Sequence, residues 1–156
     1  MIQNTTGEVY YSTRGKKMAL TSNYVEWDAT LTNEKGDWFT GIWGAGEHVS
    51  DQFFLDDGFY TMWNRDQPSP VDNGEPGRNE YGTHPFLMSH FEDSNKVRHF
   101  YGVWNQNAAG QDFIIKNNKT TGSVDVDNIM INGEIDLFFF VQEDPNKLIY
   151  IKNYIS

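Results

Sequence analysis

Residues 86–104 read FLMSHFEDSNKVRHFYGVW, two apolar and aromatic runs on either side of a short polar break. Such runs, bounded by polar residues, are typical of strands, and the break predicts that the two strands pair antiparallel. Further apolar runs follow at 113–116, 124–131 and 135–141. We expect Asn132-Gly133 to join the last two runs as a hairpin, because this dipeptide suits the positive φ angles of a tight turn.

The residues before this stretch also show patterns that are typical of strands. Residues 24–31 alternate, with Val25, Trp27, Ala29 and Leu31 on one face, which predicts a half-buried strand. Asp56-Asp57-Gly58 lies between the apolar runs 53–55 and 59–63 and predicts a second hairpin. A succession of strands without helices between them indicates a mainly β fold, an antiparallel β-sandwich.

Only at the end of the chain do the apolar residues follow a helical spacing instead of a strand pattern. Asp144 suits a helix N-cap, and Pro145 suits the first helical position. Leu148, Ile151 and Ile155 then fall on one helical face. The sequence therefore predicts one short C-terminal helix.

Composition excludes several classes of function. The net charge is -10, so nucleic acid and anionic membrane surfaces would be repelled, whereas neutral sugars would not. There is no cysteine, which excludes disulfides and thiolate metal sites. No 18-residue apolar run is present, and residues 1–20 show no apolar core of the length that a secretory signal needs. The compartment stays open, since sequons at Asn4 and Asn118 would permit glycosylation in a secretory lumen.

Residues 64–79 contain three prolines and two glycines and predict a long loop, a kind of segment that often carries function. The loop begins with Asn64-Arg65-Asp66, directly after the aromatic Trp63. A carboxylate can accept hydrogen bonds from sugar hydroxyls, and an aromatic ring can pack on the apolar face of a pyranose. From the residues alone, a surface ion pair or a turn cap at Arg65 and Asp66 explains them better.

Four blocks carry a family resemblance: GAGEHV at 44–49, FYTMWNRD at 59–66, YGTHPF at 81–86 and YGVWNQNA at 101–108. In this order and spacing, the chain from about Gly41 onward resembles glycoside hydrolase family 31, the α-glucosidase family. The resemblance implies a galactose-mutarotase-like β-sandwich (supersandwich) over 41–143, preceded by strands and turns in 1–40. It also implies that the helix at 144–156 leads toward a catalytic (β/α)8 barrel, which this chain does not contain.

The resemblance also implies roles for the loop residues. Asp66 matches the family aspartate that contacts sugar hydroxyls, and Arg65 and Asn64 match its neighbours as further substrate-binding residues. The nucleophile and the general acid of the family lie on the barrel, so we expect no catalytic residue, no cofactor and no metal in this chain. Glycoside hydrolysis needs two carboxylates at the scissile bond, and we therefore expect the chain alone to be inactive. The expected partners are a carbohydrate and the barrel, as a further domain or as a partner chain.

Two rival functions remain. The chain could be a non-catalytic structural or assembly subunit derived from the hydrolase, or a free-standing carbohydrate-binding module with an exposed aromatic row. The first forty residues supply fewer strands than the family sandwich usually has. We expect another segment or chain to cover the exposed edge, unless Trp38, Phe39 and Trp43 do so.

Three further motifs favour plain structural interpretations. Glu47-His48 with the other histidines could form a metal site or a mutarotase-like acid/base pair, but hydrogen-bonded structural histidines are the stronger interpretation. Asp125-Val126-Asp127-Asn128 opens like a calcium loop, yet Ile129 occupies a ligand position, so a solvated strand face is favoured. The glycine-rich residues 41–46 lack the order of a phosphate-binding loop and indicate a β corner.

Overall fold

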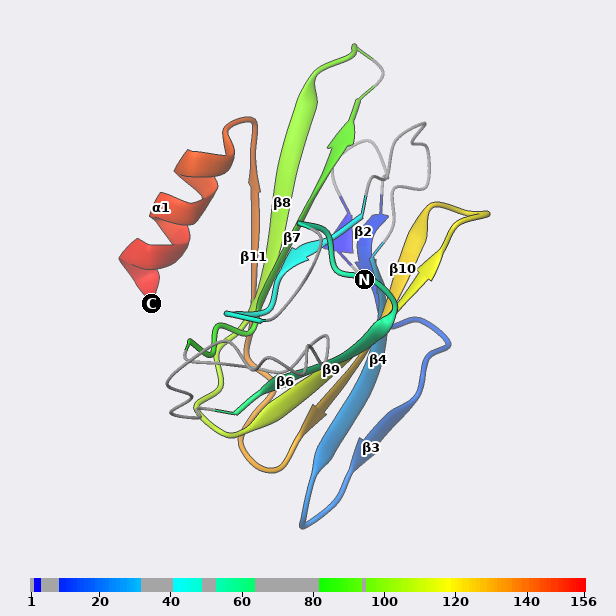
Figure 1. The fold of residues 1–156 in the computed structure, drawn as a ribbon, viewed down its shortest axis with the longest axis vertical. Helices are drawn as coiled ribbons and strands as arrows, with labels where there is room; N and C mark the ends of the chain where they lie inside the picture. The colour runs from blue at the N-terminus through cyan, green and yellow to red at the C-terminus, as the bar shows by residue number, and fades with distance from the viewer. Residues whose placement is uncertain (1, 4–8, 32–40, 49–52, 64–81, 94) are drawn as a thin grey trace, which may run out of the picture.

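The computed structural model describes residues 2–3, 9–31, 41–48, 53–63, 82–93 and 95–156 (Figure 1). Two antiparallel sheets and one helix make up this part of the chain, which confirms the mainly β sandwich with a C-terminal helix. The larger sheet has seven strands in the order β1-β2-β4-β10-β9-β6, with β3 also pairing β4, and the smaller has four in the order β11-β8-β7-β5. The strands are β1 (Ile2–Gln3), β2 (Val9–Ser12), β3 (Met18–Leu20), β4 (Val25–Leu31), β5 (Trp43–Gly44), β6 (Gly58–Met62), β7 (Phe86–Glu92), β8 (Arg98–Asn105), β9 (Gln111–Asn118), β10 (Ser123–Met130) and β11 (Leu137–Gln142).

Strands β7 and β8 form the antiparallel pair that residues 86–104 predict. The carboxylate of Asp93 organises their connection, accepting hydrogen bonds from the backbone N–H of Asn95 at 2.8 Å and of Val97 at 3.0 Å. A side chain that satisfies backbone donors in this way holds a turn in place. The polar residues between the two apolar runs therefore end strand β7 and also form the turn that leads into β8.

The main core lies between the two sheets. Alternate residues of β4 and β10 point inward, so that Trp27, Ala29 and Leu31 are buried, as their spacing predicts. On the opposing sheet, alternate members of β7 and β8 face them. These inward residues of the smaller sheet include Leu87, Phe91, Tyr101 and Val103.

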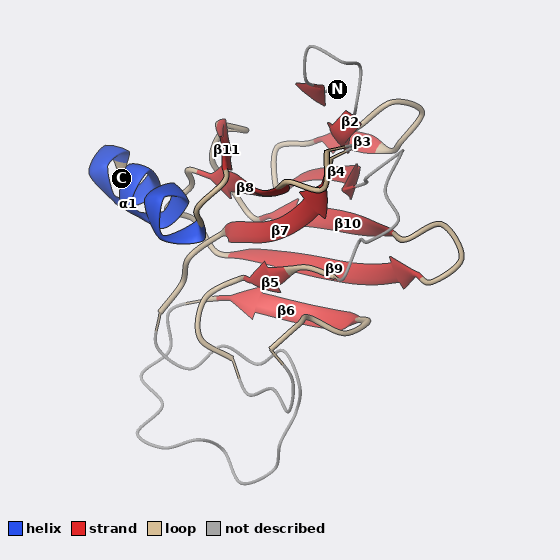
Figure 2. Ribbon diagram, turned by 90° about the horizontal axis from the view of Figure 1, so that it is seen from above, coloured by secondary structure: helices blue, strands red, loops and turns tan. Residues whose placement is uncertain are grey.

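A second apolar cluster lies on the outer face of the smaller sheet, under helix α1 (Pro145–Ile155). Figure 2 shows α1 beside β7, β8 and β11, outside the sandwich. Leu148 is fully buried there and Ile151 packs against the same cluster, whereas Ile155 is exposed, so the predicted helical face contacts the sheet except at its last residue. Asp144 caps the helix as predicted, accepting from the backbone N–H of Asn146 at 2.9 Å. No helix in the described ranges is long and apolar enough to cross a membrane.

The aromatic run at 138–140 is divided between the two clusters. Phe139 contacts the core between the sheets, where its ring lies 5.1 Å from that of Tyr11. Phe138 and Phe140 face α1 on the other side of the strand. Trp43 joins this outer face and packs against Phe53, while Trp38 and Phe39 lie outside the described residues.

The hairpin predicted at Asn132-Gly133 is wrong. Strand β10 pairs with β4 on one side and β9 on the other, so no edge of it is free for β11. The chain still turns at Gly133, where φ is +101°, but it crosses to the smaller sheet, and β11 pairs with β8.

The hairpin predicted around Asp56-Asp57-Gly58 is also wrong. Residues 53–55 form no strand, and β6 pairs with β9. The carboxylate of Asp57 accepts hydrogen bonds from the backbone N–H of Asn117 at 2.6 Å and from its Nδ2 at 3.0 Å. The turn residues therefore attach this corner to the end of β9 instead of folding 53–55 onto β6.

Candidate functional site

The predicted site residues Asn64, Arg65 and Asp66 lie outside the described residues, within 64–81. Both flanks of that segment are described. Trp63 follows β6, an edge strand of the larger sheet, and Gly82 precedes β7 of the smaller sheet. Trp63 and Gly82 therefore mark the end of the sandwich at which β6 ends and β7 begins. We call this end of the two sheets the rim.

Trp63 fixes the first flank. Its indole Nε1 donates to Oδ1 of Asp112 at 3.2 Å, and its ring lies over Gly110. A Cβ at Gly110 would lie 2.9 Å from Cδ2 of Trp63, too close for a relaxed contact. Trp63 is still 38% exposed, so part of its ring faces solvent at the rim.

The GAGEHV block fixes the second flank. The backbone N–H of Glu47 donates to the carbonyl of Gly82 at 3.1 Å, and that of Ala45 donates to the carbonyl of Phe86 at 2.9 Å. Gly44 and Gly46 both have positive φ, at +119° and +80°. A Cβ at Gly44 would lie 2.2 Å from the carbonyl oxygen of Phe86, and one at Gly46 would lie 2.3 Å from that of Gly82. Both positions therefore require glycine, and the glycine-rich stretch is a backbone corner, as predicted.

A buried polar pair lies beneath the rim. Nδ2 of Asn105 donates to Oε1 of Gln111 at 2.9 Å, and each of the two residues is 2% exposed. The backbone N–H of Asn105 donates to the carbonyl of Pro85 at 2.9 Å, while Gln111 pairs with Met62 across the β6–β9 ladder. This pair thus connects the residues that precede 64–81 with those that follow it. No spacing pattern predicts this pair, because Asn105 and Gln111 lie on strands of different sheets.

The described parts of the four sequence blocks therefore meet at the rim. GAGEHV contacts YGTHPF through two backbone hydrogen bonds, and YGVWNQNA reaches YGTHPF through Asn105. His48, in the first block, lies 5.3 Å from the ring of Tyr60, in the second. Segments far apart in the sequence thus hold both flanks of residues 64–81.

The histidines do not gather into one site. His48 lies at the rim, His84 beside Gly82, His90 on the outer face next to Trp43, and His99 against Asp93. Burial, together with Arg98, lowers the pKa of His90, and the hydrogen bond from His99 lowers the pKa of Asp93. Within the described ranges, no group of three or more His, Asp or Glu is placed to hold a metal ion.

The acidic residues of β10 belong to a charged strand face. Oδ1 of Asp125 lies 2.8 Å from Nζ of Lys16, and Oδ2 of Asp127 lies 2.8 Å from Nζ of Lys116. Asp28, on the neighbouring strand, has its pKa raised by burial and by the charge of Asp127. This arrangement supports the solvated strand face over the calcium loop.

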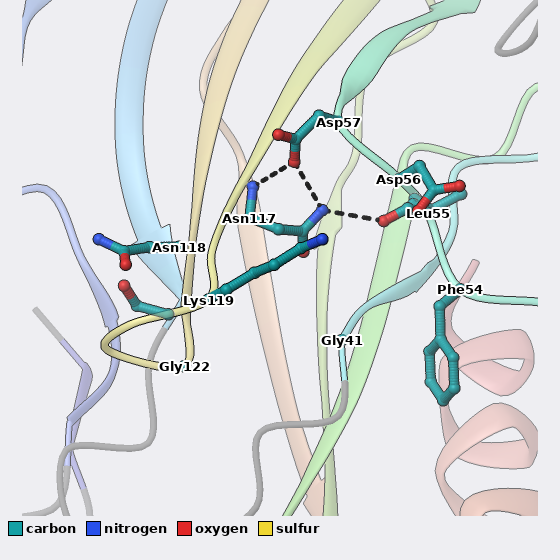
Figure 3. Close-up of a pocket in the computed structure, with 10 residues that line it drawn as sticks. Gly41, Phe54, Leu55, Asp56, Asp57, Asn117, Asn118, Lys119 and Gly122 are labelled. Atoms are coloured by element: carbon teal, nitrogen blue, oxygen red, sulfur yellow. Dashed lines mark hydrogen bonds between the residues drawn. The ribbon is translucent and has the colours of Figure 1, made fainter.

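Several hollows open on the described surface, including one of about 470 Å³ beside His99 and Lys147 and two larger ones. One, of about 570 Å³, lies between residues 54–57 and the β9–β10 turn, at the end of β9 opposite to the rim (Figure 3). The other, of about 650 Å³, lies between the GAGEHV block and α1, and Trp43, Glu47, His84 and Lys152 are among its lining residues. Only the second borders the rim. Neither could be found from the sequence, because each forms between segments that are distant along the chain.

No family model matches the chain. Sequence comparison shows it to be 34% identical over 90 residues to the lysosomal acid α-glucosidase of Tetrahymena pyriformis, covering 58% of this chain and 9% of that protein. It is 26% identical to glucoamylase 1 of Candida albicans over 156 residues, 100% of this chain and 14% of that protein. It is 23% identical to an α-glucosidase of Schizosaccharomyces pombe over 164 residues, 99% of this chain and 15% of that protein.

A further relative, an uncharacterized family 31 glucosidase of S. pombe, is 28% identical over 150 residues, 90% of this chain and 14% of that protein. The chain spans only 9% to 15% of the length of these four relatives. The similarity supports a domain from a glycoside hydrolase of this kind.

Proposed function

We propose that this chain is the accessory N-terminal, galactose-mutarotase-like β-sandwich domain of an α-glucosidase of family 31, and that it supplies a substrate-contacting loop. In this proposal Asp66 accepts hydrogen bonds from sugar hydroxyls, and Arg65 and Asn64 orient it. A (β/α)8 barrel, as a further domain or as a partner chain, supplies both catalytic carboxylates. The substrate is a carbohydrate, and the sandwich contributes recognition without bond cleavage.

The observation that carries the proposal is the meeting of the described parts of the four blocks at the rim. Trp63, held by Asp112 and Gly110, fixes where the segment 64–81 begins, and the hydrogen bond from Glu47 to Gly82 fixes where it ends. Substrate-binding loops need such rigid supports, because binding depends on the position of each polar group. The similarity to α-glucosidases and glucoamylases supplies the class of substrate.

The test is a chimaeric enzyme. The matched segment of the S. pombe α-glucosidase is replaced by this chain, and hydrolysis of maltose is measured with and without Asp66→Asn. We expect the substitution to lower kcat/KM about 10-fold to 150-fold, because a hydrogen bond to a charged acceptor contributes about 1.5 to 3 kcal/mol. The isolated chain should release no glucose.

Asp28→Asn is the matched control. Asp28 lies on the outer face of the larger sheet, where burial and the charges of Asp127 and Glu26 outweigh the attraction of Lys17 and Lys116 and raise its pKa, so a neutral side chain is tolerated there. This variant should leave kcat/KM unchanged. An Asp66→Asn chimaera as active as its parent would remove Asp66 from the site, and glucose release by the isolated chain would overturn the accessory role.

A further inference from the structure

We propose that Asn118 is an N-glycan acceptor and that the described surface keeps this corner of the sandwich open for the glycan. Asn118-Lys119-Thr120 is a sequon at the turn between β9 and β10. The proposal concerns covalent modification and is independent of the hydrolase role.

The turn fixes which end of the Asn118 amide faces outward. Oδ1 accepts hydrogen bonds from the backbone N–H of Thr120 at 3.0 Å and of Thr121 at 3.2 Å. The carbonyl of Asn118 accepts from the backbone N–H of Gly122 at 2.8 Å, and Gly122 has the positive φ, +67°, that closes the loop. With Oδ1 held toward the turn, Nδ2 lies on the opposite side of the amide.

Nδ2 is the nitrogen that a glycan needs. It makes no hydrogen bond with any described residue, and residues 118–120 are exposed. In Figure 3 the Asn118 amide points away from Asp57 and Asn117, which line the same hollow. Its neighbour Asn117 is different, because Nδ2 of Asn117 donates to the carbonyl of Leu55 at 3.2 Å and to Asp57.

The chemistry leaves the turn intact. Nδ2 attacks the anomeric carbon of a lipid-linked oligosaccharide pyrophosphate, and a nitrogen–carbon bond forms while the bond from that carbon to the phosphate oxygen breaks. The pyrophosphate leaves with the electron pair, and the amide nitrogen loses one proton. Oδ1 remains a carbonyl oxygen, so both of its hydrogen bonds to the turn persist.

The position of Asn118 would also keep a glycan clear of the rim in an assembled enzyme. Gln111, at the start of β9, lies under the rim, and Asn118 ends the same strand. Eight residues of extended strand place the two ends about 23 Å apart. A glycan on Asn118 would therefore project from the end of the sandwich opposite to the rim.

The experiment is secretion of the full chain behind a cleavable leader in a eukaryotic host, followed by peptide mass spectrometry. Cleavage before aspartate isolates residues 112–124, which hold Asn118 but not Asn4. We expect most of this peptide to carry a glycan, and enzymatic release of the glycan should convert Asn118 to Asp with a mass gain of about 1 Da. Asn118→Gln and Thr120→Ala should abolish the modification, and Thr120→Ser should retain it.

Thr121→Ala is the matched control, since it changes the same turn without touching the sequon, and it should leave occupancy unchanged. The glycosylated chain and the same chain made in a bacterial host, in which Asn118 stays an unmodified amide, should have the same Tm, because both hydrogen bonds from the turn to Oδ1 are the same in both. An unmodified 112–124 peptide, in either secreted or retained chain, would overturn the proposal. A glycan that lowers Tm would overturn the claim that the fold leaves room for it.

Discussion

Replacing Leu148 with alanine tests whether helix α1 is part of the folded unit. Leu148 is fully buried in the outer cluster with Met88, Trp104 and Phe140. The substitution removes three carbon atoms, which at about 0.8 kcal/mol each amounts to about 2.4 kcal/mol of lost burial. A partly collapsed cavity adds to this, and Leu→Ala changes in cores cost about 2 to 5 kcal/mol. Because α1 can shift on the sheet and fill part of the space, we expect about 3 kcal/mol.

Urea unfolding measures this loss. With a slope of about 2 to 3 kcal/mol per M for a domain of this size, the midpoint should fall by about 1 to 1.5 M. Fluorescence, which includes the buried Trp104, and far-ultraviolet circular dichroism should give the same midpoint if the helix unfolds with the sandwich. Tyr154→Ala is the control, because Tyr154 lies on the same helix and is 82% exposed, and its change should stay within about 0.5 kcal/mol. A loss below 1 kcal/mol for Leu148→Ala would refute the docking of α1 on the smaller sheet.

Two further predictions concern the backbone corner and the core. Gly44→Ala should destabilise far more than Gly15→Ala in the same urea assay: both glycines have positive φ, but a Cβ at Gly15 meets nothing within 4 Å, whereas one at Gly44 meets a carbonyl oxygen at 2.2 Å. Equal losses would contradict the close approach of Gly44 to Phe86. Burial raises the pKa of Tyr11 from 10.0 to about 12, so its phenol keeps its proton in the folded chain after the unfolded chain has lost it. This contribution is fully present below pH 10 and is lost as the pH rises from 10 to 12, by up to about 3 kcal/mol. In Tyr11→Phe the decline of unfolding free energy over that range should be shallower, and an unchanged decline would exclude Tyr11 as its source.

Local patterns predicted most of the longer elements, although the strand expected at 53–55 does not form. The alternation in 25–31 predicts a strand with Trp27 and Leu31 inside, and the Asp144-Pro145 signal predicts where α1 begins. These features depend on one segment and on which of its faces is apolar, so sequence spacing reports them directly.

Pairing could not be predicted in the same way. Asn132-Gly133 indicates that the chain reverses, but which strand β11 joins depends on β4 and β9 already occupying both sides of β10. The attachment of Asp57 to Asn117 and the contact between Asn105 and Gln111 likewise join segments that no local signal relates. The rim was therefore predicted only as far as its loop, and the polar pair that supports it was missed.

The residues that carry the family resemblance fall into two groups: some are required by the fold, and others are proposed to bind the substrate. Gly44 and Gly46 are required because two backbones approach closely, and Asn105 is required because it ties β8 to Pro85 and Gln111. Any sandwich with this corner would need similar residues, whether or not it met a sugar. The fold thus accounts for Gly44, Gly46 and Asn105 in these blocks. In the proposed function, Asn64, Arg65 and Asp66 are the part of the resemblance that bears on the substrate, so the Asp66→Asn chimaera tests the function separately from the architecture.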